Sequence, residues 1–299
     1  MAHSGEFSQI TSISTVSGAS LVMAAILSQS DHRWPTQEAF INSTLPKVKS
    51  LILTQNLQHS ALSLLPWHPR YWRHRVNMLA KMLQDKWGVA GTLQTMPRFP
   101  YWEINCTTFE TGNNFRIRWD YMGDEKVGYV KSPTLPISHV VAASAAFPVL
   151  IGPYILETKN LNWTYDKQGK IPKTPLAKSY TLWDGGVYDN LGLEPLYKKN
   201  GQFDKEINHL IVSDAGASLT FQERRGNISV SNLRRLLDIS SNQVNTLRVR
   251  QIKGMVVKQR TGRYISITQA AQYPTTLNAP TPEDFDTIFN DGYANAKSS

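Results

Sequence analysis

Cysteine is almost absent from this sequence. Cys106 is the only one among 299 residues, which excludes a framework of intrachain disulfide bonds. The histidines and this cysteine form no cluster with the spacing of a zinc site. We therefore expect neither a bound metal nor a cofactor.

Long apolar runs and targeting signals are also missing. No stretch approaches the roughly 18 consecutive apolar residues that a membrane-spanning helix needs. The longest apolar run near the start, Leu21 to Leu27, has no positively charged segment before it and no clear small-residue cleavage site after it. We expect neither a signal peptide nor a transmembrane helix. The sequence leaves the compartment open and favours a cytoplasmic or peripheral membrane location.

Acidic residues are the scarcer charge, with 23 Asp and Glu against 32 Lys and Arg and a formal net charge of +9. A basic balance favours anionic partners, either nucleic acid or the headgroups of anionic lipids. A generic basic surface explains the charge equally well. Hydrophobic residues make up 41% of the sequence, which is enough to bury a substantial core in one large α/β domain.

One segment, "PWHPRYWRHR" at 66–75, interleaves aromatic and basic residues, and a second basic region follows at 248–263. At a lipid surface, Trp and Tyr lie at the headgroup level and Arg attracts anionic lipid. Nucleic-acid binding uses the same mixture, but no nucleic-acid-binding motif accompanies it, and we expect no nucleic acid partner. A solvated face with Trp packed inward is a third alternative. The candidate membrane-surface contacts are Trp67, Arg70, Tyr71, Trp72 and Arg73.

Hydrophobic periodicity and turn residues predict alternating strands and helices. Strands are expected at 8–16, in a pair within 101–129 that turns at 111–114, at 180–186 and at 207–216. Helices are expected at 21–29, 73–87, 139–148 and 233–247, and after Thr281. Continuous apolar runs that alternate with helices favour a mostly parallel sheet covered on both faces. We therefore expect an α/β protein with a three-layer α/β/α fold and a central, mainly parallel sheet, formed by one domain over 1–299 with a helical insert at 33–96.

The segment "LWDGGVYDNLGLE" at 182–194 places an acid directly before two glycines. Gly185 and Gly186 permit backbone angles that other residues avoid, so Asp184 stands at a tight, open bend. Such a bend is either a surface turn or a carboxylate presented to a reacting group. A second acid, Asp189, is expected to hold the turn through hydrogen bonds from the backbone to its side chain.

The segment around Ser17 has the order strand, sharp turn, helix that a nucleophile elbow requires. The turn exposes the serine hydroxyl, and the start of the helix supplies free N–H groups and a positive dipole beside it. Small residues are needed around the serine because strand and helix nearly touch there. Gly18 and Ala19 follow it, so that Thr-Val-Ser-Gly-Ala meets the pattern Gly-x-Ser-x-Gly loosely. Taken alone, an ordinary N-cap serine explains this segment better.

Three segments in order resemble the patatin-like phospholipase family: the Ser17 elbow, "HVVAASAAFPVLIGPY" at 139–154, and Asp-Gly-Gly at 184–186. In that family the elbow, an Ala-Ser-x-Ala-x-Pro helix and an Asp-Gly-Gly/Ala turn occur in this sequence order. In addition, "INCTTFETGNNFRI" at 104–117 is similar to the Asn-Ala-Thr…Thr-Gly strand pair of bacterial members. The resemblance covers residues 10–216 and extends more thinly to the C-terminus.

The resemblance implies a Ser-Asp dyad in which Ser17 is the nucleophile and Asp184 is the base. A serine hydroxyl needs a neighbouring base, and burial raises the pKa of a carboxylate toward the working pH. The motif residues that support the dyad are Gly18, Ala19, Gly185 and Gly186. The implied reaction is hydrolysis of an acyl ester of a phospholipid or related lipid, of phospholipase-A or lysophospholipase type, through an acyl-enzyme and without metal or cofactor.

The family also carries a glycine-rich oxyanion loop well upstream of its elbow. The sequence before Ser17 contains Gly5 and no such loop. We therefore expect the first strand, the oxyanion loop and the helix after it to be missing, as in a fragment. Two alternatives remain: another segment replaces the loop, or the chain is a catalytically inactive fragment or relative that retains only lipid-surface binding. Losing one oxyanion donor alone typically costs about 10²–10³ in rate.

A histidine base is the nearest enzymatic rival, because Ser17, Asp184 and His209 have the chain order of an α/β-hydrolase triad. His209 begins an apolar run and fits a strand residue, and His139 precedes an alanine-rich helix and fits a cap or packing residue. We expect both to be structural. Likewise, "VSDAG" at 212–216 is expected to be a polar turn after a buried strand, not a second acidic site.

Overall fold

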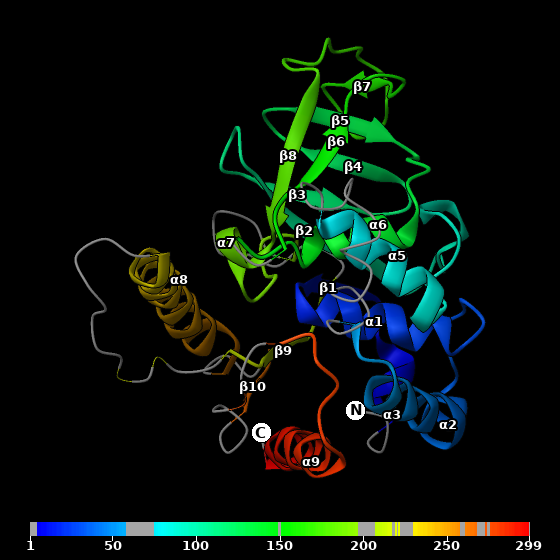
Figure 1. The fold of residues 1–299 in the computed structure, drawn as a ribbon, viewed down its shortest axis with the longest axis vertical. Helices are drawn as coiled ribbons and strands as arrows, with labels where there is room; N and C mark the ends of the chain where they lie inside the picture. The colour runs from blue at the N-terminus through cyan, green and yellow to red at the C-terminus, as the bar shows by residue number, and fades with distance from the viewer. Residues whose placement is uncertain are drawn as a thin grey trace. The chain divides into compact units, whose positions relative to one another are not determined.

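A computed structural model describes residues 5–57, 75–148, 151–196, 207–216, 219, 221, 230–257, 261–267, 273 and 276–298 (Figure 1). The chain divides into two compact units. The first unit comprises Met1–Tyr188, Gly192–Pro195 and Thr276–Ala279. The second comprises Asp189–Leu191, Leu196–Thr275 and Pro280–Ser299. The expectation of one domain with an insert at 33–96 stays a prediction.

The first unit contains a curled, mostly antiparallel sheet (Figure 1). Its eight strands are β1 (Ser12–Val16), β2 (Tyr101–Thr108), β3 (Asn114–Ile117), β4 (Tyr121–Asp124), β5 (Gly128–Lys131), β6 (Tyr154–Glu157), β7 (Trp163–Thr164) and β8 (Ser179–Asp184). They follow the order β6-β8-β2-β3-β4-β5-β7, with β1 also paired to β2. Among these strands, β1 and β2 form the only parallel pair.

This sheet contradicts the expected three-layer fold with a central, mainly parallel sheet. Strands β2 to β5 follow one another through turns of a few residues, and connections that short join only antiparallel neighbours. The strand pair expected within 101–129 is confirmed by β2 and β3. The error came from interpreting continuous apolar runs as parallel strands. β2 is buried along nearly its whole length although most of its neighbours are antiparallel.

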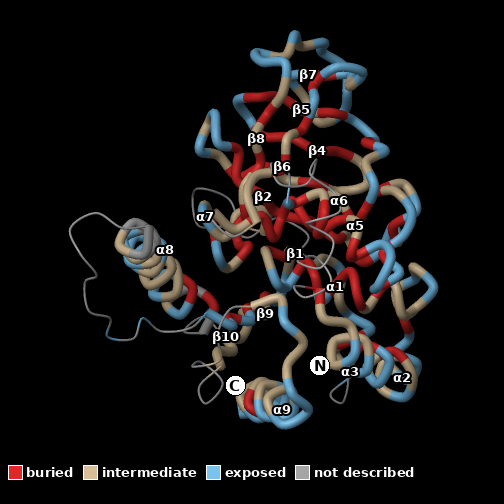
Figure 2. Tube along the Cα trace, in the orientation of Figure 1, coloured by how far each residue is buried: buried red, intermediate tan, exposed pale blue. Residues whose placement is uncertain are grey.

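Helices of this unit pack against the sheet through α1 and α6. They are η1 (Glu6–Gln9), α1 (Gly18–Ser28), α2 (Gln37–Ala39), η2 (Phe40–Thr44), α3 (Leu45–Thr54), α5 (Arg75–Trp87), η5 (Leu93–Thr95), α6 (Ile137–Ser144) and α7 (Gly186–Asp189). α5 agrees with the helix expected at 73–87, and its apolar stripe is buried. α6 packs against α1, α5, β2 and β8. The core is formed by residues of both the helices and the strands, which are the buried segments in Figure 2.

The second unit contains β9 (Leu210–Asp214) and β10 (Gly262–Ser266), which pair in parallel as a sheet of two strands. Its helices are α8 (Val230–Ile252), η6 (Lys253–Val257) and α9 (Pro282–Ser298). The strand expected at 207–216 and the helix at 233–247 are both present. α9 is capped by Thr281, because Thr281 Oγ1 accepts the Asp284 N–H at 3.1 Å and donates to the Asp284 carboxylate at 2.8 Å.

Two sequence expectations concern membranes. None of the described helices is both long and apolar enough to cross a bilayer. The candidate membrane-surface contacts, Trp67, Arg70, Tyr71, Trp72 and Arg73, lie outside the described residues. Membrane-surface contact through that segment therefore stays a prediction.

Candidate active site

Two strands of the first unit meet end to end along one edge of β2. β1 runs parallel to the first part of β2, with Val16 paired to Asn105. β8 runs antiparallel to the next part, with Asp184 paired to Cys106. Because β3 occupies the other edge of β2 over these residues, the C-terminal ends of β1 and β8 face each other. Both strands turn away at this junction, and Ser17, the residue after β1, lies next to Asp184, close enough for its hydroxyl to lower the pKa of that carboxyl.

Ser17 has backbone angles that few non-glycine residues adopt. Its φ is 51° and its ψ is −122°, outside the regions that L-residues prefer. An N-cap serine is normally extended, and its side chain accepts a hydrogen bond from the helix. The Ser17 side chain makes no capping bond, although its carbonyl oxygen accepts the N–H groups of Ser20 and Leu21. Ser17 is therefore a strained elbow, and its hydroxyl is not used by α1.

Asp184 is a buried acid on the apolar face of β8. Tyr180, Leu182 and Asp184 alternate with more exposed residues and share the face that meets the core. Asp184 Oδ1 accepts the Gly186 N–H at 2.7 Å, whereas its buried Oδ2 has no hydrogen-bond partner among the described residues. Burial raises the pKa of Asp184 to about 6, against a smaller lowering by the Ser17 hydroxyl and the Gly186 N–H. Such a carboxylate can accept a proton near neutral pH.

The small size of Gly185 lets β8 end directly against β2. A Cβ at Gly185 would lie 2.4 Å from the carbonyl oxygen of Asn105 and 3.2 Å from Cγ1 of Val16. The first of these atoms belongs to a paired strand and cannot move aside cheaply. A Cβ at Gly18 would instead meet nothing within 4 Å, and both Gly18 and Ala19 are exposed. The backbone that approaches β2 closely at the candidate site is therefore that of Gly185, after β8, and not that of Gly18.

A comparison with family models matches residues 2–197 to the model described as "Patatin-like phospholipase". The matched segment spans more than half of the chain and includes both strand ends described above. The chain belongs to the patatin-like phospholipase family. Membership indicates a lipid acyl hydrolase and lipid substrates, without identifying the lipid. A search of curated proteins finds no match.

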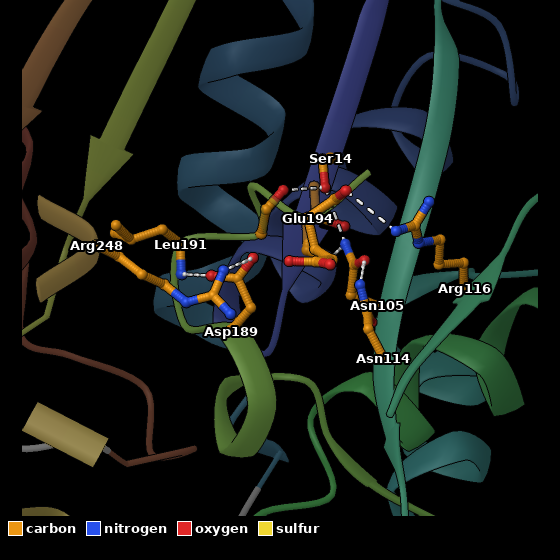
Figure 3. A network of polar contacts seen from close by, with 10 residues as sticks. Ser14, Asn105, Asn114, Arg116, Asp189, Leu191, Glu194 and Arg248 are labelled. Carbon is orange, nitrogen blue, oxygen red and sulfur yellow. Dashed lines mark hydrogen bonds and ion pairs between the residues drawn. The ribbon is translucent and has the colours of Figure 1, made fainter. Parts of the chain in front are cut away.

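The patatin-like chain also contains a polar network that the sequence analysis missed (Figure 3). The Asn105 amide donates to Ser14 Oγ at 2.9 Å and to the Thr15 carbonyl oxygen at 3.0 Å. Its own oxygen accepts from the Asn114 amide at 3.0 Å. Ser14 Oγ donates to the carbonyl oxygen of Gly192 at 2.6 Å. These bonds fix β1, and the chain that follows the Asp-Gly-Gly turn, to β2.

The sequence feature that indicates this network is a polar residue at every second position of β2. Glu103, Asn105 and Thr107 occupy every second position and therefore share one face of the sheet, although all three are buried. Buried polar side chains need partners, and Thr107 finds one by donating to the Asp184 carbonyl oxygen at 2.9 Å. Polar residues at alternate positions of a buried strand thus indicate a bonded face, which the sequence analysis did not use.

Asp189 lies in the second unit of the patatin-like chain and holds its turn. Its Oδ1 accepts the Leu191 N–H at 3.2 Å, which confirms the expected bond from the backbone to its side chain (Figure 3). Its Oδ2 also forms an ion pair with Arg248 at 3.2 Å. Asp189 is only 1% exposed, so the ion pair compensates a buried charge.

The two histidines occupy different surroundings. His139 lies in α6 with its ring edge-on to Tyr154 at 5.9 Å, and burial lowers its pKa. This environment is that of a packing residue, as expected. His209 immediately precedes β9, is exposed, and belongs to the second unit, whereas Ser17 and Asp184 belong to the first.

Proposed function

We propose that the protein hydrolyses acyl esters of phospholipids or related lipids through a Ser17–Asp184 dyad. The observation that carries this proposal is the buried Asp184 Oδ2, which has no partner among the described residues and lies beside a serine that does not cap its helix. A native structure rarely leaves a buried polar atom unpaired, and such atoms concentrate at functional sites. Family membership supports the class of substrate.

In the proposed first step, the Ser17 hydroxyl gives its proton to Asp184 while Ser17 Oγ forms a bond to the ester carbonyl carbon. The tetrahedral intermediate collapses as the ester C–O bond breaks, and the leaving alcohol takes the proton from Asp184. Water then loses a proton to Asp184 and attacks the acyl-enzyme. Ser17 regains its proton as the fatty acid leaves, so the dyad returns to its starting state.

The tetrahedral intermediate carries a negative oxygen that needs preorganised N–H donors. Gly18 and Ala19 begin α1, are exposed, and donate their N–H groups to no other described residue. The first N–H groups of a helix have no partner within the helix and lie at its positive end. In the proposed mechanism these two groups act as oxyanion donors beside Ser17.

A fluorophosphonate probe, which reacts with activated serines, tests the dyad. We expect labelling at Ser17 that disappears in Ser17→Ala and slows strongly in Asp184→Asn. The matched control is Ser28→Ala at the other end of α1, where the hydroxyl donates to the Ala25 carbonyl oxygen at 3.0 Å and accepts from the Gln29 amide at 3.3 Å. Labelling that survives Ser17→Ala would contradict the proposal.

The release of fatty acid from phosphatidylcholine vesicles and from lysophospholipid micelles tests the class of substrate. We expect release from at least one of them, and its loss in Ser17→Ala. A chain that binds the vesicles but is neither labelled by the probe nor active on either lipid would support the alternative function, lipid-surface binding without catalysis.

A further inference from the structure

The end of α6 lies at the junction of the two strands that carry the candidate dyad. α6 ends at Ser144, whose carbonyl oxygen accepts the Gly185 N–H at 3.3 Å. Two residues later, the Ala146 carbonyl oxygen accepts the Asp184 N–H at 3.1 Å. The Ser144 hydroxyl accepts the Ser17 N–H at 3.2 Å. Ser144 therefore contacts the backbone on both sides of the proposed dyad.

Ser144 also belongs to a chain of buried hydroxyl groups. Its Oγ lies 2.8 Å from the Asn105 carbonyl oxygen and 2.8 Å from Ser20 Oγ. Ser20 Oγ lies 2.8 Å from Thr15 Oγ1, which accepts the indole N–H of Trp102 at 2.9 Å. None of these five residues is more than 5% exposed, so each group depends on its protein partners.

The two ends of this chain determine the direction of every bond in it. A carbonyl oxygen only accepts and an indole N–H only donates. Ser144 therefore donates its single proton to the Asn105 carbonyl oxygen. Ser20 must then donate to Ser144, and Thr15 must donate to Ser20. With the Ser17 N–H as its second donor, the Ser144 oxygen has its full complement of one donated and two accepted bonds.

We propose that Ser144 is a positioning residue for the Ser17–Asp184 dyad, an inference that rests on the proposed function. The strained angles of Ser17 persist only where the surroundings hold them. Ser144 holds the Ser17 N–H with an oxygen whose orientation is set by β2, and it holds the end of β8 with its carbonyl oxygen. Ser144 of α6 therefore keeps the side chains of Ser17 and Asp184 in their relative position.

Three variants separate positioning from general packing. Ser144→Ala removes the acceptor of the Ser17 N–H. Ser20→Ala removes one donor to Ser144 and leaves the Ser17 bond in place. Ser138→Ala is the matched control, because Ser138 lies in the same helix, is only 2% exposed, and takes no part in the hydroxyl chain.

The first readout is the rate at which the fluorophosphonate labels Ser17 in the intact chain. A displacement of about 1 Å in a catalytic group costs about 100-fold, so we expect a loss of about 10- to 100-fold in Ser144→Ala, a smaller loss in Ser20→Ala, and none in Ser138→Ala. The probe concentration at half-maximal rate should stay unchanged, because Ser144 only positions the dyad. A loss in Ser144→Ala no larger than in Ser138→Ala overturns the proposal.

The second readout is amide hydrogen exchange, which does not depend on activity. In Ser144→Ala we expect faster exchange confined to peptides covering 15–21 and 183–187. Equal acceleration across the first unit would show a merely stabilising role and overturn the inference. If the wild-type chain shows no Ser17 labelling, the proposed function fails, and the exchange pattern still decides whether Ser144 positions the two segments. If Ser144→Ala does not fold, Ser20→Ala must accelerate exchange at 15–21 more than Ser138→Ala does.

Discussion

Asp184 in the first unit and Asp214 in the second end their strands in the same way. Each is buried and is the last residue of its strand. Each Oδ1 accepts the N–H two positions further on, at 2.7 Å from Gly186 and at 2.8 Å from Gly216. Up to this bond the Asp-Gly-Gly and Asp-Ala-Gly turns are local equivalents.

The two carboxylates differ at the second oxygen. Asp214 Oδ2 accepts the Tyr264 hydroxyl at 2.7 Å and the Asn245 amide at 3.4 Å. Asp184 Oδ2 has no partner among the described residues. The turn alone therefore does not make an acid at a strand end reactive. What distinguishes a structural acid from a candidate base is whether its outer oxygen is already bonded.

The largest expected effect comes from replacing each acid by its amide. Asp184→Asn removes the proposed base and should lower fatty acid release or probe labelling by at least about 10³-fold, as in other serine hydrolases that lose such a group. Asp214→Asn should leave the rate near that of the wild type, because Asp214 only bonds its own surroundings. Equal losses of activity in the two variants would remove the distinction between them.

The next effect concerns stability and its pH dependence. Burial raises the pKa of Asp184 from 3.8 to about 6, so the folded state binds this proton more tightly than the unfolded state does. The free energy of unfolding should therefore fall as pH rises from about 4 to 6, by about 3 kcal/mol, and stay low above pH 6. Asp184→Asn should lack this fall. Chemical denaturation of both chains at pH 4 and pH 7 measures it, and parallel changes would contradict the proposed cause.

The elements around Ser17 and Asp184 could be predicted from the sequence because their signals are local. β1 followed by α1, and β8 followed by its glycines, agree with the expected order, although β1 begins at Ser12 and the first residues of the strand expected at 8–16 belong to η1. The fold class could not be predicted in the same way. Whether two strands pair in parallel depends on which strands become neighbours. The short turns after β2 make its successors antiparallel neighbours, although the apolar runs had suggested parallel strands.

The environment of the candidate site was still harder to predict. Ser144 stands among alanines in α6, and in the sequence it is one more small residue. Its role depends on bonds to Ser17, Ser20 and Asn105, which come from other parts of the chain. The surroundings of Asp184 Oδ2, the oxygen without a hydrogen-bond partner among the described residues, likewise depend on two distant strands that share one edge of β2. Such juxtapositions have no local signature.

A smaller effect on the free energy of unfolding should follow from replacing the residue after Asp184 and the residue after Asp214. Gly185→Ala places a Cβ 2.4 Å from the Asn105 carbonyl oxygen, so we expect a loss of about 2 kcal/mol in the free energy of unfolding. Ala215 is exposed, and Ala215→Gly should cost no more than about 1 kcal/mol, through the added freedom of the unfolded chain. Urea denaturation of both variants measures the difference. A loss for Ala215→Gly as large as that for Gly185→Ala would show that the requirement at Gly185 is not steric.

The smallest effect should come from making Asp214 more like Asp184. Tyr264→Phe removes the short hydrogen bond to Asp214 Oδ2 and leaves the longer one from Asn245. We expect a loss of about 1 kcal/mol in the free energy of unfolding, because one partner remains. The control is Tyr165→Phe, because Tyr165 is 62% exposed and the loss should be close to zero. The variant should gain no probe labelling, because the probe reacts with an activated serine and not with a carboxylate that lacks a hydrogen-bond partner. New labelling in Tyr264→Phe would show that the open oxygen alone creates reactivity.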